Sequence, residues 1–272
     1  MKVIISRDNP FFKQLVKLEK SARQRKTAGL TLLDGVHLIS AYQLALGPPQ
    51  SLIVSESGCE NEEIKSLLAE QGAKADADVV VLSDVLFREV SPVKTPTGIM
   101  ALVPIPSAAA IPIHKERKGE SFRVLLEAIQ DPGNLGSIFR SAAAAGASDV
   151  YLSDGCADAW SPKTLRAAMG AHFLLRVHER SDLVAVARTF NGKVIATTLQ
   201  AKMILYQTQL TGPIAFVLGN EGMGLSEEAL LEAASEQIHI PMHVGTESLN
   251  AAAAAAVCFF ERVRQLRLIG NA

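Results

Sequence analysis

The sequence predicts a two-domain α/β protein. In both halves of the chain, short apolar runs of strand length alternate with segments that have helical spacing, a pattern typical of α/β domains. The chain has 272 residues, enough for two modest domains, and a charged stretch with three prolines separates its halves. Apolar residues make up 48% of the chain and charged residues only 20%, which excludes a wholly disordered protein.

The first predicted element is a helix with a basic face. Leu15, Leu18 and Ala22 recur at helical spacing, and the pair Asn9-Pro10 before them is a typical helix start. Residues 2–26 carry eight Lys and Arg side chains against one Asp and one Glu, although the whole chain has a formal net charge of −1. From charge alone, such a run fits a solvated helix face better than a surface that binds phosphate groups.

The rest of the N-terminal half is predicted to contain four strands and at least one helix. The segment 36–46 has the character of a helix, and residues 104–120, with three prolines and a charged tail, suit neither a helix nor a core strand. We therefore expect one domain over residues 1–104, a linker over 105–120 and a second domain over 121–272. The four predicted strands are residues 30–33, 52–54, 79–82 and 99–103.

The second half is predicted to form a mostly parallel sheet with helices on both faces. Apolar residues between 135 and 142 follow helical spacing, residues 226–234 have acidic side chains in their first turn, and the alanine tract 251–256 indicates a closely packed helix. The predicted strands are residues 123–129, 149–152, 193–197, 213–218 and 237–240.

Three loops, residues 130–140, 218–226 and 240–250, each follow a predicted strand. In an open α/β sheet, ligands bind at this edge. In the first loop, Asp131-Pro132 is a typical helix cap, and the amides behind it could receive an anion, although a cap alone is the commoner meaning. Arg140 falls two turns into the following helix, among apolar residues, where it must find a partner or reach a cleft.

Other enzyme classes fit these loops poorly. The second loop is rich in glycine but lacks the Gly-x-Gly-x-x-Gly pattern, which disfavours a dinucleotide-dependent oxidoreductase. In the third loop, Ser248 could simply cap the alanine helix, and the absence of Gly-x-Ser-x-Gly argues against a serine hydrolase. The six histidines show no paired spacing with acids, and the three cysteines are widely scattered, so we expect neither a metal site nor a disulfide framework.

The sequence contains no candidate membrane anchor. Its longest apolar run, residues 251–260, is far shorter than the roughly 20 residues of a membrane span. Charged residues interrupt the N-terminus before an apolar core of signal-peptide length can form. We therefore expect a cytoplasmic protein.

Taken together and in this order, the three loops resemble the signature motifs of the TrmH/SpoU branch of the SPOUT methyltransferases. Residues 165–171 resemble the family segment between the first two motifs, with Ala168 where a serine is common. More loosely, the first hundred residues resemble the L30e-like substrate-binding module of this family, through Asn9, the basic helix and residues 32–37. The matching motif residues are Asp131, Pro132, Asn134, Gly136 and Arg140; Leu218, Gly219, Glu221, Gly222 and Gly224; and Ile240, Pro241, Met242, Ser248, Leu249 and Asn250.

This resemblance implies a C-terminal SPOUT domain with a deep trefoil knot and a smaller N-terminal L30e-like domain. It implies transfer of a methyl group from S-adenosylmethionine to a ribose 2′-hydroxyl of RNA, by a homodimer whose site forms at the subunit interface. Glycine at 219 would let the main chain approach the cofactor adenine closely. The implied cofactor positions are Leu218, Gly219, Ile240, Met242 and Leu249, and the implied catalytic positions are Arg140, Asn134, Glu221, Ser248 and Asn250.

The resemblance also suggests roles for these side chains. A guanidinium is essentially always protonated in proteins, so we expect Arg140 to hold the adjacent phosphate and orient the ribose rather than to act as a base. Asn134 and Asn250 would orient groups through amide hydrogen bonds, and Glu221 would fix the loop or the partner subunit. The resemblance favours the phosphate-facing interpretation of the basic helix, and the expected RNA-binding side chains are Lys13, Lys17, Lys20, Arg23 and Arg25.

The sequence leaves three alternatives for the function: methylation of ribosomal RNA, methylation of transfer RNA, or RNA binding without catalysis. An N-terminal module of this type favours ribosomal RNA over transfer RNA. A non-catalytic RNA-binding protein that acts in ribosome assembly on the same fold is the third alternative, and the intact set of motif residues argues against it.

Overall fold

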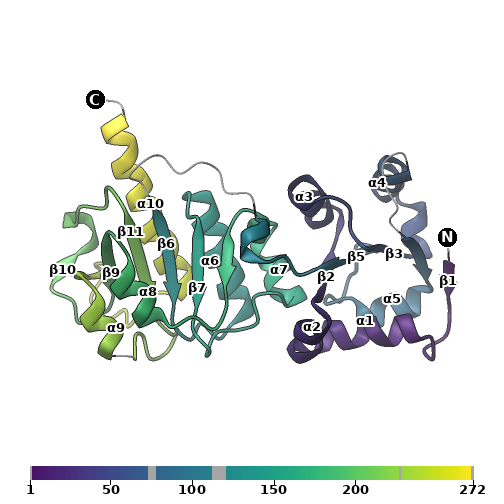
Figure 1. The fold of residues 1–272 in the computed structure, drawn as a ribbon, viewed down its shortest axis with the longest axis horizontal. Helices are drawn as coiled ribbons and strands as arrows, with labels where there is room; N and C mark the ends of the chain where they lie inside the picture. The colour runs from purple at the N-terminus through teal and green to yellow at the C-terminus, as the bar shows by residue number, and fades with distance from the viewer. Residues whose placement is uncertain (1, 73–77, 112–120, 227, 271–272) are drawn as a thin grey trace. The chain divides into compact units, whose positions relative to one another are not determined.

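The computed structural model describes residues 2–72, 78–111, 121–226 and 228–270, and the chain divides into two compact units (Figure 1). Unit 1 comprises Met1–Ile111 and Trp160–Phe173, and unit 2 comprises Pro112–Ala159 and Leu174–Ala272. Part of the expected linker, residues 112–120, lies outside the described residues. The division differs from the expected one in one respect, because Trp160–Phe173 belongs to unit 1 although it stands within the second half of the sequence.

Unit 1 contains a five-stranded sheet. The four expected strands are confirmed, and a short edge strand, β1, adds a fifth. The strand β5 is antiparallel to both of its neighbours, whereas the other pairs are parallel. The spatial order is β1 (Lys2–Ile4), β4 (Asp78–Leu82), β3 (Ser51–Ser55), β5 (Ile99–Pro104) and β2 (Leu30–Asp34).

The expected basic helix is two helices, α1 (Pro10–Lys20) and α2 (Ala22–Ala28). Asn9 caps α1 as expected and accepts a hydrogen bond from the amide of Phe11 at 2.9 Å. Ser21 ends α1 in an extended conformation and caps α2. Ala22 is therefore exposed, and the buried face of the first helix ends at Leu18. The other helical elements of this half are α3 (Val36–Leu46), α4 (Glu62–Gly72), α5 (Asp84–Val90) and the 3-10 turns η1 (Ser57–Glu60) and η2 (Ala108–Ala110).

The inserted segment, Trp160–Phe173, completes the core of unit 1. It contains α7 (Pro162–Ala168), which packs against β2, and η3 (Ala171–Phe173), which packs against α3. The hydroxyl of Thr31 donates to the carbonyl of Trp160 at 2.7 Å, and the ring of Phe173 meets that of Tyr42 edge-on at 5.3 Å. All four residues are almost fully buried, so the insertion is part of the hydrophobic core.

Unit 2 contains a seven-stranded sheet in which every pair of neighbours is parallel, in agreement with the sequence analysis. The strand β6 ends at Leu126, three residues before its expected end, because Ala128 takes a left-handed conformation with φ of 52°. The spatial order is β10 (Met203–Ile204), β12 (Glu236–His239), β9 (Lys193–Thr197), β11 (Ile214–Leu218), β6 (Phe122–Leu126), β7 (Asp149–Leu152) and β8 (Arg176–His178).

Helices cover both faces of this sheet (Figure 1). On β11, Ala215 and Val217 pack in one apolar cluster with residues of α8 (Leu183–Thr189) and α9 (Glu228–Ala233). Phe216 points to the opposite face, where its ring lies 5.7 Å from that of Phe259 in α10 (Ala251–Gly270). The helix α10 packs against α6 (Pro132–Ala144), and both therefore lie on this second face.

A buried carboxylate at the start of β7 should make a large contribution to stability. The side chain of Asp149 is 3% exposed and accepts hydrogen bonds from Ser148, Arg176 and His178. Burial raises its pKa, but the bonds from His178, Arg176 and Ser148 outweigh burial and hold the pKa far below its ordinary value. The stabilisation is therefore complete above the ordinary aspartate pKa of about 3.9 and is lost as the pH falls below it.

We expect the D149N variant to be about 3 kcal/mol less stable than the wild type at pH 7, because the change leaves buried donors without their charged acceptor. Urea unfolding at several pH values measures this difference, which should narrow below pH of about 4. The control is D154N, since Asp154 is exposed and lies 3.7 Å from Arg180. Equal stability of D149N and D154N would contradict the prediction.

Candidate active site

A cavity of about 490 Å³ lies at the carboxyl edge of the unit 2 sheet, where β9, β11 and β12 end. Main-chain and side-chain atoms of the loops after these strands, and of the start of α10, form its wall. It brings together seven of the ten positions that the resemblance implies for the cofactor or for catalysis: Leu218, Gly219, Glu221, Ile240, Met242, Ser248 and Leu249.

The loop after β11 folds back on itself, and Gly219 makes this possible. Asn220 and Gly224 exchange two main-chain hydrogen bonds of 2.9 Å. A Cβ atom on Gly219 would lie 2.2 Å from the carbonyl carbon of Gly224, which is closer than real Cβ atoms approach. The family resemblance implies a close approach of the cofactor ring at this glycine, and the structure supplies a separate reason within the protein.

Side-chain contacts tie the same loop to the first motif. The side-chain Nδ2 atom of Asn220 donates to the main-chain carbonyl of Ala128 at 2.8 Å. The carboxylate of Glu221 accepts hydrogen bonds from the amides of Gln130 and Asp131, both at 3.2 Å, and from the side chain of Asn134 at 3.1 Å. These contacts join residues that lie about ninety positions apart in the sequence.

The hydrogen bonds around Glu221 also fix its charge. Partial burial raises the pKa of this carboxyl, but its own amide, the Asn134 side chain and the amides of Gln130 and Asp131 together lower the pKa below its ordinary value. Glu221 is therefore ionised at neutral pH. An anion that accepts several N–H donors at once is well suited to anchor two loops.

Asn250 links the third loop to this network. Its side-chain nitrogen donates to the Oδ1 atom of Asn134 at 2.8 Å, and its own Oδ1 accepts from the amides of Ala252 and Ala253. Asn250 therefore caps α10, the function that the sequence analysis considered for Ser248. Ser248 lines the cavity instead.

Arg140 differs from the other selected residues. It is exposed on α6 and is not part of the cavity wall, contrary to the apolar surroundings that the sequence suggested. In the part of the chain that the structure describes, its guanidinium has no ion pair and no hydrogen bond. Its charge is therefore available to a group outside this chain.

Sequence reasoning missed several site residues. Thr197 and Thr198 line the cavity and directly follow the predicted strand 193–197, so the rule that ligands bind at strand ends would have found them. Glu127 lies outside the cavity wall but holds the end of the loop after β11: it is 6% exposed, and its carboxylate accepts hydrogen bonds from the amide and hydroxyl of Ser226, both at 2.9 Å. No sequence pattern joins two residues separated by 99 positions.

The basic helices of unit 1 are mostly as expected, with one correction. Lys13 and Lys17 line a groove of about 450 Å³, and Lys20 and Arg23 are exposed. Arg25, however, is only 4% exposed and donates to the main-chain carbonyls of Leu18 and Glu19 at the end of α1. Arg25 therefore stabilises the end of α1 and, unlike the four exposed cations, is not expected to bind RNA.

Within the described residues, no three His, Cys, Asp or Glu side chains gather where they could hold a metal ion. Nor does any helix there have the length and apolar character needed to cross a membrane.

The chain is similar to known RNA methyltransferases over almost its whole length. It is 34% identical to the 23S rRNA (guanosine(2553)-2′-O)-methyltransferase RlmP of Bacillus subtilis, over 96% of this chain and 98% of the relative. A crystal structure of an RNA 2′-O ribose methyltransferase matches with a TM-score of 0.81 and 30% identity, over 98% of this chain and 99% of that one. The SpoU methyltransferase AviRb of Streptomyces viridochromogenes, solved with its cofactor AdoMet, matches with a TM-score of 0.80 and 27% identity, over 96% and 100% of the two chains.

Two family models match the two halves of the sequence. Residues 9–101 match the MRM3-like substrate binding domain, and residues 121–260 match the SpoU rRNA Methylase family. These matches confirm the family and the fold class that the three loops indicated. The chain belongs to the SpoU rRNA Methylase family.

Proposed function

We propose that this protein transfers a methyl group from S-adenosylmethionine to a ribose 2′-hydroxyl of ribosomal RNA. The observation that carries the proposal is the cavity at the ends of β9, β11 and β12, whose wall contains all five positions implied for the cofactor. The Bacillus relative is named as a 23S rRNA 2′-O-methyltransferase, and AviRb was solved with AdoMet, which support the reaction and the cofactor.

The cavity fits S-adenosylmethionine in size and in chemistry. Its volume falls within the usual range for small-molecule sites, about 300–1,000 Å³. Leu218, Ile240 and Leu249 offer apolar contacts for a flat ring, while Thr197 and Thr198 offer hydroxyl groups. When bound, S-adenosylmethionine supplies an electrophilic methyl group.

The residues of this chain would act mainly by positioning. Methyl transfer needs the ribose oxygen aligned with the methyl group, and a well-oriented pair of reactants removes a large part of the barrier. Arg140 would hold a phosphate next to the target ribose through a charged, bidentate contact. Glu221, Asn134 and Asn250 would keep the three loops in register through the hydrogen bonds already described.

Ser248 would offer its hydroxyl to a ligand from the cavity wall, where the structure places it. An oxygen of the phosphate that Arg140 holds would accept the proton of the 2′-hydroxyl, because a guanidinium stays protonated and cannot serve as the base.

We propose that Lys13, Lys17, Lys20 and Arg23 of unit 1 bind the RNA backbone. Replacing Lys17 by alanine should weaken rRNA binding and reduce the salt dependence of the affinity, since one phosphate contact is lost. Replacing Arg25 by alanine should instead lower thermal stability, because Arg25 bonds the carbonyls at the end of α1. Filter binding over a range of salt concentrations, together with thermal unfolding, separates the two effects. Equal losses of stability in both variants would contradict this assignment.

The protein is proposed to act as a homodimer through the face formed by α6 and α10. These helices pack against each other, and Arg140, Ala144 and Ala253 are exposed on them, as is Phe260, which is 47% exposed. The position of Arg140 outside the cavity wall supports a site that a second copy completes. Light scattering should give twice the 29.1 kDa mass of the chain.

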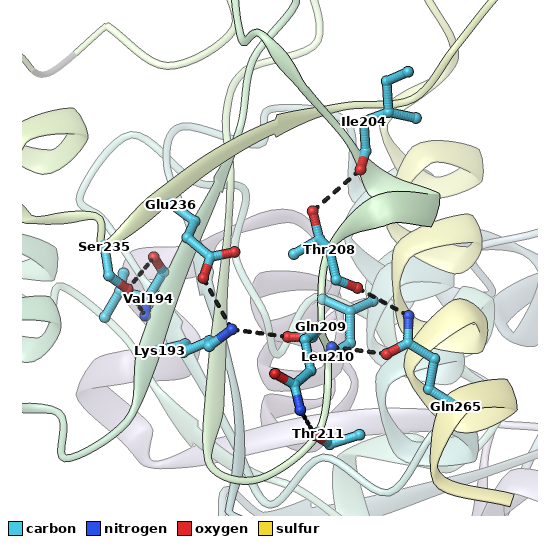
Figure 2. A network of polar contacts seen from close by, with 10 residues as sticks. All are labelled: Lys193, Val194, Ile204, Thr208, Gln209, Leu210, Thr211, Ser235, Glu236 and Gln265. Carbon is cyan, nitrogen blue, oxygen red and sulfur yellow. Dashed lines mark hydrogen bonds and ion pairs between the residues drawn. The ribbon is translucent and has the colours of Figure 1, made fainter. Parts of the chain in front are cut away.

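The C-terminal part is proposed to form a trefoil knot. The loop between β9 and β11 contains β10, which pairs with β12, and the same loop contacts α10. Gln265 of α10 donates to the carbonyl of Thr208 at 3.0 Å and accepts from the amide of Leu210 at 2.8 Å (Figure 2). One loop thus holds the elements on both sides of residues 240–250, which supports threading of that segment.

The deciding experiment is transfer of labelled methyl from S-adenosylmethionine to bulk rRNA and, separately, to bulk tRNA, each from cells that lack this gene. We expect a 2′-O-methylated nucleoside in the rRNA pool, and a product in the tRNA pool alone would replace the substrate proposal. Cofactor binding without transfer to either pool would indicate an assembly intermediate as substrate. No cofactor binding would support the non-catalytic alternative.

A cytoplasmic location is part of the proposal, since assembling ribosomes would be the site of action.

A further inference from the structure

The inserted segment places an arginine on the surface of unit 1. Arg166 lies in α7, and its side chain is 46% exposed. Its Nη1 atom lies 3.6 Å from the Oδ2 atom of Asp34, at the end of β2. Within the described ranges its guanidinium makes no other ion pair or hydrogen bond, so most of its five N–H donors have no acceptor in that part of the chain.

Asp34, the partner of Arg166, lies in an unusual environment for a carboxylate. The Asp34 side chain is 3% exposed, and its Oδ1 atom has no hydrogen-bond partner in the described part of the chain. Burial raises the pKa of Asp34, and Arg166 acts in the opposite direction. A buried ion pair is weak support for a fold, because apolar residues of similar volume often stabilise it as well or better.

A second feature at the same point is the uncapped start of α3. Asp34 is followed by Gly35, the N-cap of α3, which as a glycine has no side chain to accept from the first amides. The first turn of this eleven-residue helix holds no acidic side chain, and His37 in that turn is exposed. A helix start of this kind favours binding of an anion. The guanidinium of Arg166, which has only one ion pair in the described residues, also favours an anion.

We propose that Arg166 binds a backbone phosphate of the RNA substrate and that Asp34 is its positioning residue. The buried carboxylate holds one edge of the guanidinium, and the outward edge remains free for a bidentate contact with phosphate oxygens. The inference rests on the proposed function, since it assumes an RNA substrate. It assigns an RNA contact to a segment that stands within the methyltransferase half of the sequence but folds into unit 1.

The sign of the effect of one substitution separates this proposal from a general charge effect. Asp34→Asn removes a negative charge from unit 1, so an unspecific electrostatic effect would strengthen RNA binding. If Asp34 orients Arg166, the same change weakens binding although the protein becomes more positive. The test is the affinity of the full-length protein for the rRNA pool, measured by filter binding over a range of KCl concentrations.

We expect R166A to bind rRNA about tenfold more weakly, with a salt slope smaller by roughly 0.7–0.9. R166K should keep most of the salt slope but lose affinity, because an ammonium cannot make the bidentate contact. D34N should also bind more weakly, and the double variant D34N/R166A should bind no more weakly than R166A. In methyl-transfer assays with rRNA as the varied substrate, R166A should raise the KM for RNA and leave kcat near its wild-type value.

The matched control is Lys65→Ala, another exposed cation of unit 1, which pairs with Glu60 and Glu62 and should leave the affinity unchanged. The single tryptophan of the chain, Trp160, reports through its fluorescence whether the inserted segment keeps its place. If D34N loses that signal, R166A and R166K still decide the question.

Wild-type affinity and slope in R166A, or tighter binding in D34N with the Trp160 signal intact, would overturn the inference. Methyl transfer to RNA by the wild type together with either result leaves the proposed function standing. Absence of transfer in the wild type refutes the proposed function, whereas these binding measurements concern Arg166 alone.

Discussion

Replacing Arg140 by alanine is expected to lower the rate of methyl transfer by about 10²- to 10³-fold, the usual cost of losing one charged positioning group at a reacting centre. The affinity for S-adenosylmethionine should stay unchanged, because Arg140 is not part of the cavity wall. The fold should also remain intact, since Arg140 is exposed and has no ion pair in the described residues. Single-turnover transfer with labelled cofactor measures the loss.

Two further variants make this result interpretable. R188A removes an exposed arginine from α8, on the opposite face of the sheet, and should transfer methyl at the wild-type rate. R140K retains the charge without the bidentate geometry and should recover only part of the activity. Transfer by R140A at the wild-type rate, with normal binding of cofactor and RNA, would refute the proposed role of Arg140.

Gly219→Ala is expected to abolish detectable binding of S-adenosylmethionine. The added methyl group would stand 2.2 Å from the carbonyl carbon of Gly224 and 2.4 Å from the amide nitrogen of Leu225. Both atoms are main chain and cannot rotate away, so the loop would have to open. Opening would displace Asn220 and Glu221, whose contacts hold the first motif. Isothermal titration with the cofactor measures the loss.

A matched glycine in the same loop provides the control. A methyl group on Gly222 would find its nearest atom, Oδ1 of Asn220, at 3.6 Å, which is an ordinary contact. We therefore expect G222A to weaken cofactor binding less than tenfold, within about 1.4 kcal/mol. If G219A bound cofactor as well as G222A, the loop would not depend on the close approach at position 219.

Local patterns predicted most of the strands and the edge at which the site lies. Runs such as 149–152 and 193–197 coincide with β7 and β9, because buried parallel strands are continuous apolar segments. The carboxyl-end rule then grouped three loops, of which residues 218–226 and 240–250 line one cavity. Hydrogen bonds of Glu221 and Asn250 join the first loop to these two. The short strands β1, β8 and β10, of two or three residues each, carry too little pattern to be recognised.

Contacts between distant parts of the chain could not be predicted from these local patterns. The burial of Arg25 depends on the carbonyls that α1 leaves free at its end, so its charge alone placed it with the exposed lysines. The contact between Glu127 and Ser226 and the return of Trp160–Phe173 to unit 1 are tertiary effects as well. Neither follows from spacing along the chain.

The inserted segment also determines the order in which this protein can be completed during its synthesis. When residue 111 leaves the ribosome, the strands of unit 1 are present, but Tyr42 still lacks Phe173 and the Thr31 hydroxyl lacks the Trp160 carbonyl. The part of the N-terminal core around Tyr42 therefore stays incomplete until about sixty further residues have emerged. A fragment cut at the apparent domain boundary would lack these two buried contacts, although the core cluster between Ile4 and Leu102 would be present.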